Sequence, residues 1–353
     1  MKIRVAILDN DVNYLSRISD VFHTKYAERI ELYSFTDCET AVEALASTRI
    51  HVFLASDLFD VECARLPEKC GFAYFVESGG IEMIRGRKAV CKFQKADVIY
   101  QQILSIYSDC SEGISGTGFR ETDGKRIAFL SPVGGSGSST MAAACALHFA
   151  RQGKKVFYLN LEKFGSADLF FSGDGSFNLS DVIFALKNKK ANMETRLESC
   201  MKLDEGGVAF FSHPKVALDA MELRADEIRR LLIGLQTVDD YEYIVLDMDF
   251  AIDADMLELY SMMQSIVMVG DGSEISNWKI SRAYQTFFVL EQVMDTILTD
   301  HIVTIYNRFN STYCKLISGD GPQNIGGAPR YRNVSVRQMV RQLSSMEMFD
   351  HIV

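Results

Sequence analysis

The sequence predicts two α/β domains in one chain, each built on a parallel β-sheet. Apolar runs of strand length alternate with helical patterns, stop at one polar segment and restart after it. The length of 353 residues allows two domains of roughly 150 residues each. Because hydrophobic residues make up 48% and prolines number only 5, disordered and low-complexity classes are excluded.

The first domain is predicted over residues 1–107. Its strands are expected at Ile3–Leu8, Glu31–Phe35, His51–Ala55, Phe72–Val76 and Ala89–Phe93, and its helices at Val12–Lys25, Glu39–Ala46 and Ala96–Ile106. The stretch that follows is rich in Ser, Gly, Thr and charge and lacks periodic apolar residues. We therefore expect a linker over residues 108–124.

The second, larger domain is predicted over residues 125–353. Strands are expected at Arg126–Leu130, Val156–Asn160, Val208–Phe211, Ile244–Asp247, Ile266–Val269 and Ile302–Tyr306. Helices are expected at Ser139–Arg151, Asp181–Asn188, Ala225–Leu235 and Ile275–Glu291. This order again favours a parallel sheet with helical crossovers.

Composition narrows the function classes. Lys+Arg of 37 against Asp+Glu of 47 gives a net charge of -10, which disfavours a nucleic-acid partner. The eight cysteines form no C-x-x-C pair and lie in apolar segments, as reduced cytoplasmic thiols do. No apolar run approaches the roughly 18 residues of a spanning helix, and Met1–Asp9 is expected to be a strand rather than a signal peptide. The six histidines show no metal-ligand spacing, so we expect no zinc site.

A glycine-rich turn joins a predicted strand to a predicted Ala-rich helix. We call Val133–Thr140 the glycine loop; it contains Gly134, Gly135, Ser136, Gly137, Ser138, Ser139 and Thr140. Glycines let backbone N–H groups converge, and a helix N-terminus adds partial positive charge. The pattern therefore favours phosphate binding over an ordinary βα turn.

The loop resembles the K-G-G-x-G-K-[ST]-[ST] motif of MinD/ParA-type P-loop ATPases, which have a deviant Walker A sequence. Val133 and Ser138 stand where that family has its two lysines. The resemblance implies binding of ATP with Mg²⁺, the Ser139 hydroxyl being a metal ligand. Loss of the phosphate lysine weakens binding by roughly ten- to a hundredfold and makes hydrolysis slow or absent.

Later motifs resemble the same family in the expected order. Asn160 and Glu162 match the two acids of its D-x-D switch, which implies Glu162 as the catalytic carboxylate, although a solvated loop charge is the alternative. Tyr243–Asp247 resembles a Walker B strand that supplies Asp247 to Mg²⁺, with Asp249 as a neighbour that could substitute.

Two further segments resemble the family's base-binding elements. Asn307 and Arg308 match an N-[KR] pair whose amide reads adenine, whereas a turn residue is the alternative for Asn307. Gly326–Tyr331 is similar to the loop that packs on the base, which implies contacts from Pro329 and Arg330. A P-loop NTPase fold is therefore expected for 125–353.

The first domain resembles a response-regulator receiver, which has a flavodoxin-like sheet. Its site residues would be Asp9, Asp11, Ser56, Ser78 and Lys92. Ser56 stands at the phosphoacceptor position and Asp57 comes one residue late, on the other face of a strand. We expect a degenerate receiver without phosphotransfer.

This domain order resembles the TadZ/CpaE family of pilus assembly proteins, to which LNLEKFGSADLFF is similar. The resemblance implies a cytoplasmic homodimer that binds ATP, contacts other components of a Tad-type (Flp) pilus apparatus and acts at a cell pole. Three alternatives stay open: a ParA-type partition ATPase, a MinD-type positioning switch, and a signalling protein with a working receiver.

Overall fold

The computed structural model divides the chain into two compact units, which we describe separately. One contains residues 1–118, 174–176 and 185–200, and the other contains 119–173, 177–184 and 201–353. Most of the predicted linker, residues 111–123, lies outside the described residues. The structure describes residues 2–110, 124–188, 192–294, 297–317, 319 and 321–352.

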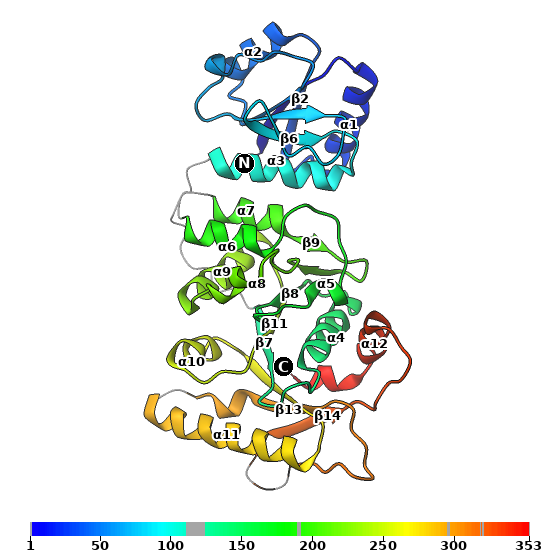
Figure 1. The fold of residues 1–353 in the computed structure, drawn as a ribbon, viewed down its shortest axis with the longest axis vertical. Helices are drawn as coiled ribbons and strands as arrows, with labels where there is room; N and C mark the ends of the chain where they lie inside the picture. Colours follow the sequence, from blue (N-terminus) through cyan, green and yellow to red (C-terminus); the bar gives the residue numbers. More distant parts are fainter. Residues whose placement is uncertain are drawn as a thin grey trace. The chain divides into compact units, whose positions relative to one another are not determined.

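The first unit is built on a mainly parallel sheet in the order β2-β1-β3-β4-β6-β5 (Figure 1). Only β5 pairs antiparallel among the described strands. Its strands are β1 (Ile3–Leu8), β2 (Ile30–Phe35), β3 (Val52–Ser56), β4 (Gly71–Val76), β5 (Met83–Ile84) and β6 (Arg87–Cys91). Its helices are α1 (Val12–Lys25), α2 (Cys38–Ser47), α3 (Ala96–Cys110), a short 3-10 turn Cys63–Arg65, and α7 (Met193–Cys200).

Two apolar clusters fill the first unit, one on each face of the sheet. The α1 and α3 side contributes Leu15, Phe22 and Ile103, and the α2 side contributes Ala41 and Leu45. The polar residue that precedes each of α1 and α2 caps it, because Asp11 accepts from Tyr14 N and Asp37 accepts from Thr40 N. The predicted receiver-like sheet is confirmed.

The second unit has an eight-stranded sheet in the order β14-β13-β12-β7-β11-β8-β10-β9, in which only β9 pairs antiparallel. Its strands are β7 (Lys125–Leu130), β8 (Val156–Asn160), β9 (Lys202–Leu203), β10 (Val208–Phe210), β11 (Tyr243–Asp247), β12 (Ser265–Gly270), β13 (Ile302–Tyr306) and β14 (Gln323–Gly327). Helices are α4 (Ser138–Arg151), α5 (Ala167–Phe170), α6 (Leu179–Lys187), α8 (Ala217–Met221), α9 (Ala225–Val238), α10 (Ala254–Tyr260), α11 (Glu274–Met294) and α12 (Val336–Leu343), with 3-10 turns Thr299–His301 and Glu347–His351. Helix α6 spans the division between the two units.

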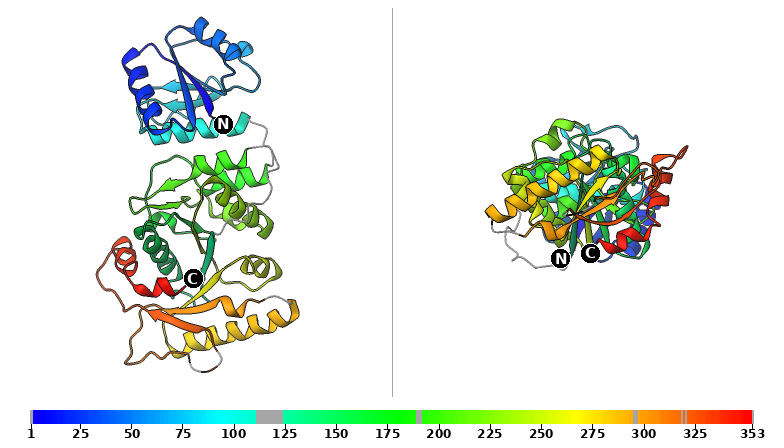
Figure 2. Two further views of the ribbon diagram at one scale, coloured as in Figure 1. Left: turned by 180° about the vertical axis from the view of Figure 1, so that it is seen from behind. Right: turned by 90° about the horizontal axis from the view of Figure 1, so that it is seen from below.

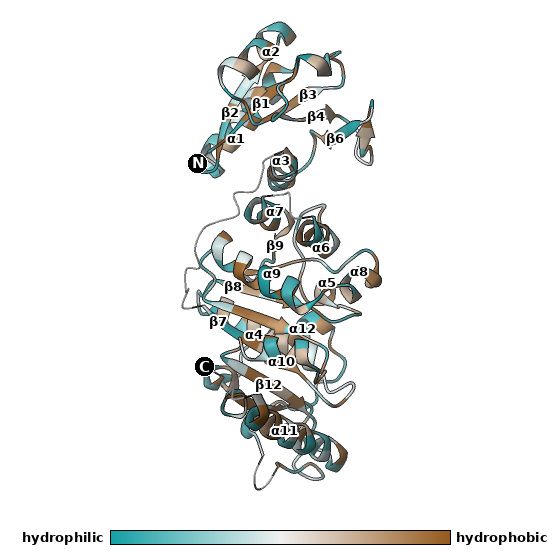
Figure 3. Cartoon of the chain, turned by 90° about the vertical axis from the view of Figure 1, so that its left-hand side faces the viewer, coloured by the Kyte–Doolittle hydropathy of each residue, from teal (hydrophilic) through white to brown (hydrophobic). Residues whose placement is uncertain are grey.

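Helix α4 is the central helix of this unit. Residues Met141–Phe149 are all buried, and the small side chains of the Ala-rich run let the helix approach the sheet closely. Helix α12 packs beside α4 on one face, whereas α9 and α10 lie on the other (Figures 1 and 2). Strands at the centre of the sheet are largely hydrophobic, as Figure 3 shows, because both faces are covered.

Candidate functional site

The glycine loop connects the carboxyl end of β7 to the first turn of α4. Gly135 has φ 71° and Gly137 has φ 89°, values that favour glycine. Gly137 is the N-cap of α4, and its carbonyl accepts the first helical hydrogen bond from Met141 N at 3.0 Å. The loop therefore presents the N-terminus of a 14-residue helix together with three adjacent hydroxyl residues.

Asn307 and Arg308 directly follow β13 and hold this loop, although β12 lies between β13 and β7 in the sheet. Asn307 Nδ2 donates to the Ser136 carbonyl at 2.9 Å, and the Arg308 guanidinium donates to the Gly135 carbonyl. Arg308 adopts φ 58°, a conformation that is strained for a residue other than glycine. Sequence separates these residues by about 170 positions, yet the predicted base-binding pair and the predicted phosphate loop lie in direct contact.

Gly137→Ala should disturb the loop far more than Gly134→Ala. A Cβ at Gly137 would overlap Asn307 Nδ2, and its positive φ disfavours alanine, whereas a Cβ at Gly134 meets no described atom within 4 Å. We expect Gly137→Ala to lower the free energy of unfolding by about 1–2 kcal/mol. The Gly134→Ala control should stay within about 0.5 kcal/mol, measured by denaturant titration. Equal losses of stability in the two variants would contradict the role of Asn307 in holding the glycine loop.

The carboxyl ends of β8 and β11 bring the predicted acids beside the loop. Ser139 Oγ donates to Glu162 Oε1 at 3.0 Å. The Asn160 amide nitrogen lies 3.1 Å from Glu162 Oε2 and 2.8 Å from Asp247 Oδ2. The predicted metal ligands Ser139 and Asp247 and the predicted catalytic Glu162 thus belong to one hydrogen-bonded cluster.

Asp247 is completely buried, and Tyr158 donates to its Oδ2 at 2.8 Å. Burial, and then the nearby charge of Glu162, raise the pKa of Asp247 well above its usual range. The neighbouring Asp249 is exposed and accepts from the Lys163 backbone N–H at 3.0 Å. Asp249, the alternative metal ligand, therefore already accepts a hydrogen bond from the segment that follows Glu162.

The remaining predicted residues of the nucleotide site lie around the same edge. Val133 is half-buried, and its backbone N–H donates to Ser131 Oγ at 3.0 Å. Ser138 Oγ is a buried atom without a hydrogen-bond partner in the described part of the chain. Pro329 and Arg330 are exposed and follow Ala328, whose carbonyl accepts from Phe309 N at 2.9 Å. Thr140 is half-buried in the first turn of α4.

The predicted receiver site gathers at the carboxyl edge of the first sheet. Lys92 is buried and its Nζ lies 3.2 Å from Asp9 Oδ2 and 3.0 Å from Glu77 Oε1. Burial acts to lower the pKa of Lys92, but the hydrogen bonds with Glu77 and Asp9 outweigh it and raise the pKa. Asp11 caps α1, so its carboxylate is committed to Tyr14 N.

Ser56 ends β3 and is 2% exposed, and it directly follows Ala55, which pairs with Leu8 in the register between β1 and β3. Its hydroxyl accepts from Leu58 N at 3.4 Å. Ser78, by contrast, is exposed and donates to the Gly79 carbonyl. At this edge Lys92 is already paired with Asp9 and Glu77, and Glu77 rather than Ser78 contacts Lys92.

Comparison with known proteins supports both halves of this description. The model of the TadZ-like receiver domain matches residues 1–108. The amino-terminal domain is a TadZ-like receiver domain. The predicted resemblance to TadZ/CpaE proteins is confirmed by this match over residues 1–108. No curated protein matches the chain.

Among the solved structures, a ParA family ATPase from Chlorobium tepidum TLS has a TM-score of 0.52 and 19% identity, over 65% of this chain and 98% of that one. The MinC:MinD cell division complex of Aquifex aeolicus gives 0.46 and 15%, over 63% and 96%. Cobyrinic acid a,c-diamide synthase from Mycobacterium smegmatis, with bound ATP analog and magnesium, gives 0.44 and 13%, over 63% and 93%. At these identities only the fold is shared, and the first match carries that conclusion.

The TadZ-like receiver domain should not form an aspartyl phosphate. Ser56 occupies the predicted phosphoacceptor position at the end of β3, and a hydroxyl cannot form an aspartyl phosphate. Lys92 is already paired with two carboxylates. Incubation with radiolabelled acetyl phosphate and Mg²⁺ is expected to leave the protein unlabelled. Stable labelling that disappears on Asp57→Asn would show instead that Asp57 is the acceptor.

Two residues of these sites escaped the sequence reading. Tyr158 lies inside an apolar strand pattern and looks like an ordinary core aromatic. Glu77 comes one residue before the predicted Ser78, within the usual error of a loop register. The period-2 pattern gave a usable signal for Tyr158, because it shares a strand face with Asn160.

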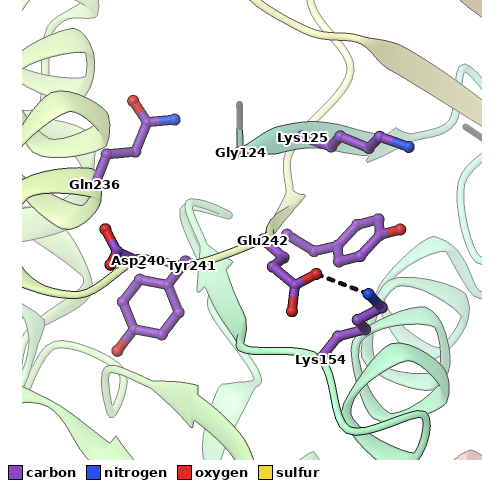
Figure 4. Close-up of a pocket in the computed structure, with 8 residues that line it drawn as sticks. Gly124, Lys125, Lys154, Gln236, Asp240, Tyr241 and Glu242 are labelled. Carbon is purple, nitrogen blue, oxygen red and sulfur yellow. Dashed lines mark hydrogen bonds and ion pairs between the residues drawn. The ribbon is translucent and has the colours of Figure 1, made fainter. Parts of the chain in front are cut away.

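A separate pocket opens at the opposite, amino-terminal edge of the large sheet (Figure 4). Its walls include Lys125, Gln236 and Tyr241, and Lys154 pairs with Glu242 at 2.8 Å. The glycine loop lies at the carboxyl ends of the strands, so this pocket is distinct from the site formed by the glycine loop, Glu162 and Asp247. No described helix is long and apolar enough to cross a membrane.

Proposed function

We propose that this chain is an ATP-binding scaffold of a Tad-type pilus assembly and secretion apparatus, with little or no ATP hydrolysis. The carrying observation is the combination of a TadZ-like receiver domain with a ParA-type fold whose loop has Val133 and Ser138 in place of two lysines. Scaffold function needs a nucleotide-responsive surface, whereas rapid turnover needs cations at the phosphates.

The glycine loop fits a phosphate by its own construction. In this proposal, backbone amides between Gly135 and Ser139 and the N-terminus of α4 would bind an anion. The buried, unpaired Ser138 Oγ offers a hydroxyl donor at the position of the missing lysine. In this proposal Asn307 contacts the base, and Pro329 and Arg330 lie beside it, while Arg308 keeps the loop in shape.

The acids beside the loop fit Mg²⁺. Asp247 Oδ1 is buried and has no hydrogen-bond partner within the described residues, and Ser139 and Glu162 lie next to it. Carboxylate and hydroxyl oxygens are ligands that Mg²⁺ prefers, together with nucleotide phosphates. Bound Mg²⁺ would supply positive charge to the phosphates, and Glu162 would then be the group that orients a water.

ATP with Mg²⁺ should bind in a one-to-one ratio with the chain. The expected dissociation constant is in the micromolar to sub-millimolar range, because the amides remain and the lysines do not. Titration calorimetry measures it, with Gly137→Ala as the impaired variant and Gly134→Ala as the matched control. If millimolar ATP produced neither heat of binding nor thermal stabilisation of the protein, the proposal would be wrong.

The same proposal includes a homodimer whose interface contains the glycine-loop face. Val133 replaces a cation there, so the contact between subunits would be apolar rather than an ion pair with phosphate. Localisation to the cytoplasmic side of a cell pole and contact with other pilus components follow from the TadZ/CpaE resemblance. Sedimentation with and without ATP tests the dimer directly.

A conventional positioning or partition ATPase is the second candidate, since the fold is shared with a ParA family ATPase. The observation in its favour is Glu162, which lies beside Ser139 as a catalytic carboxylate would. Steady-state hydrolysis separates the two candidates. A turnover near 1 s⁻¹, in the ordinary enzyme range of roughly 1–10³ s⁻¹, would favour the ATPase.

A further inference from the structure

Tyr158 and Asn160 form a hydrogen-bonded support for one buried carboxylate. They lie two residues apart on β8, so their side chains share a face of that strand. Asn160 is directly opposite Asp247 in the register between β8 and β11. The Tyr158 hydroxyl and the Asn160 amide both donate to Asp247 Oδ2, each at 2.8 Å. Two neutral donors therefore fix the orientation of this carboxyl group.

The other oxygen of Asp247 is left without a donor. The residue is 0% exposed, and Oδ1 has no hydrogen-bond partner in the portion of the chain that the structure describes. A buried carboxylate oxygen without a partner carries a desolvation penalty of about 1–3 kcal/mol or more. A divalent cation is the ligand that satisfies such an oxygen most directly, because hard cations select carboxylate oxygen.

Because position 160 carries an amide rather than a carboxylate, the cluster contains two carboxylates, Asp247 and Glu162. The Asn160 amide nitrogen lies within hydrogen-bond distance of both Asp247 and Glu162, so it separates two carboxylates. A carboxylate at position 160 would bring a third negative charge to the same place without adding a donor. Fewer carboxylates give weaker binding of a free divalent cation, since ligand charge tunes affinity.

We propose that Tyr158 and Asn160 are positioning residues that set the divalent-metal affinity of this site. They hold Oδ2 of Asp247, leave Oδ1 for the metal, and keep the cluster at two carboxylates. The metal then enters with the nucleotide, whose phosphates complete its ligands, rather than binding alone. This inference rests on the proposed binding of ATP with Mg²⁺. It assigns to Tyr158 and Asn160 the dependence of Mg²⁺ binding on the nucleotide.

Asn160→Asp tests the charge argument without any nucleotide. Thermal unfolding of the full chain is followed in EDTA and across a Mg²⁺ titration. The unaltered protein should show little response to Mg²⁺ alone, whereas Asn160→Asp should unfold at a lower temperature in EDTA and regain stability with Mg²⁺. We expect apparent Mg²⁺ affinity to rise roughly tenfold or more. A variant destabilised equally in EDTA and in Mg²⁺ would show a merely structural role and overturn the inference.

Tyr158→Phe is the milder second variant, and Tyr260→Phe is its matched control. Tyr260 is equally buried, but its hydroxyl donates to the Ala251 carbonyl, away from the acids. Tyr158→Phe should raise the Mg²⁺ concentration needed for half-maximal ATP binding by roughly three- to tenfold, with binding in EDTA unchanged. Tyr260→Phe should change neither. An unchanged Mg²⁺ requirement in Tyr158→Phe contradicts the positioning role. If the unaltered protein does not bind ATP, the proposed function is contradicted, and the Mg²⁺ titration of Asn160→Asp then decides the inference alone.

Discussion

Replacing Val133 and Ser138 together by lysine is expected to raise ATP hydrolysis by on the order of 10³-fold. The two positions lie at the start of the glycine loop and at the first residue of α4, where cations would reach the phosphates of a bound nucleotide. Ser139, Glu162 and Asp247 are already clustered beside them. Phosphate release from the purified chain measures the gain.

The gain should depend on Glu162. Glu162→Ala in the double-lysine protein removes the carboxylate that would orient water, so hydrolysis should fall back toward the unaltered level. Asp249→Ala is the matched control, because Asp249 contacts the Lys163 backbone rather than the Ser139 hydroxyl. Loss of the gain in both variants, or in neither, would contradict the role given to Glu162.

Lys92→Ala is expected to destabilise the receiver domain by about 3–5 kcal/mol. The substitution leaves Asp9, which is completely buried, without its cation, and it also removes the charge that faces Glu77. Lys92 further lies over the rings of Tyr14 and Phe93, at 5.6 and 5.2 Å from their centres. Denaturant unfolding followed by circular dichroism measures the loss.

Lys88→Ala provides the control for this experiment. Lys88 pairs with Asp109 at 2.6 Å, but both side chains are exposed, so its loss should change stability by at most about 1 kcal/mol. The raised pKa of Lys92 also has a consequence for pH. Its stabilising contribution should be complete below the ordinary lysine value of 10.5 and decline as pH rises through the raised value.

Sequence patterns predicted most of the large elements because each carries its own period and boundary signals. Strand β8 and the Ala-rich helix α4 are examples, since apolar content and the flanking glycine turn specify them locally. Short elements such as β14 and α8 were not predicted. The β14 sequence QNIGG contains Ile as its single large apolar residue, and the five residues of α8 are too few to repeat a helical pattern, so packing against distant parts of the chain decides their conformation.

The candidate site was predictable as a set of residues but not as a set of contacts. Resemblance to a known motif pointed to Asn307, Glu162 and Asp247. It did not show that the Asn307 amide bonds to the loop itself or that Tyr158 supports Asp247. Such contacts join residues about 90 to 170 positions apart, and only the strand order places them together.

The contacts of Asn307 and Arg308 with the glycine loop reduce the conformational entropy that phosphate binding would have to remove. Because Asn307 and Arg308 hold the carbonyls of Ser136 and Gly135, the chain fixes the shape of the loop during folding. Ordering a flexible residue on binding takes about 1–2 kcal/mol of conformational entropy, and a loop that is already rigid avoids that loss. In the proposed complex, preorganisation of the loop at Gly135 and Ser136 would offset part of the attraction that two absent lysines would have provided. A loop held in shape in this way would still bind phosphate in the proposed complex, although it lacks the lysines that promote phosphate transfer.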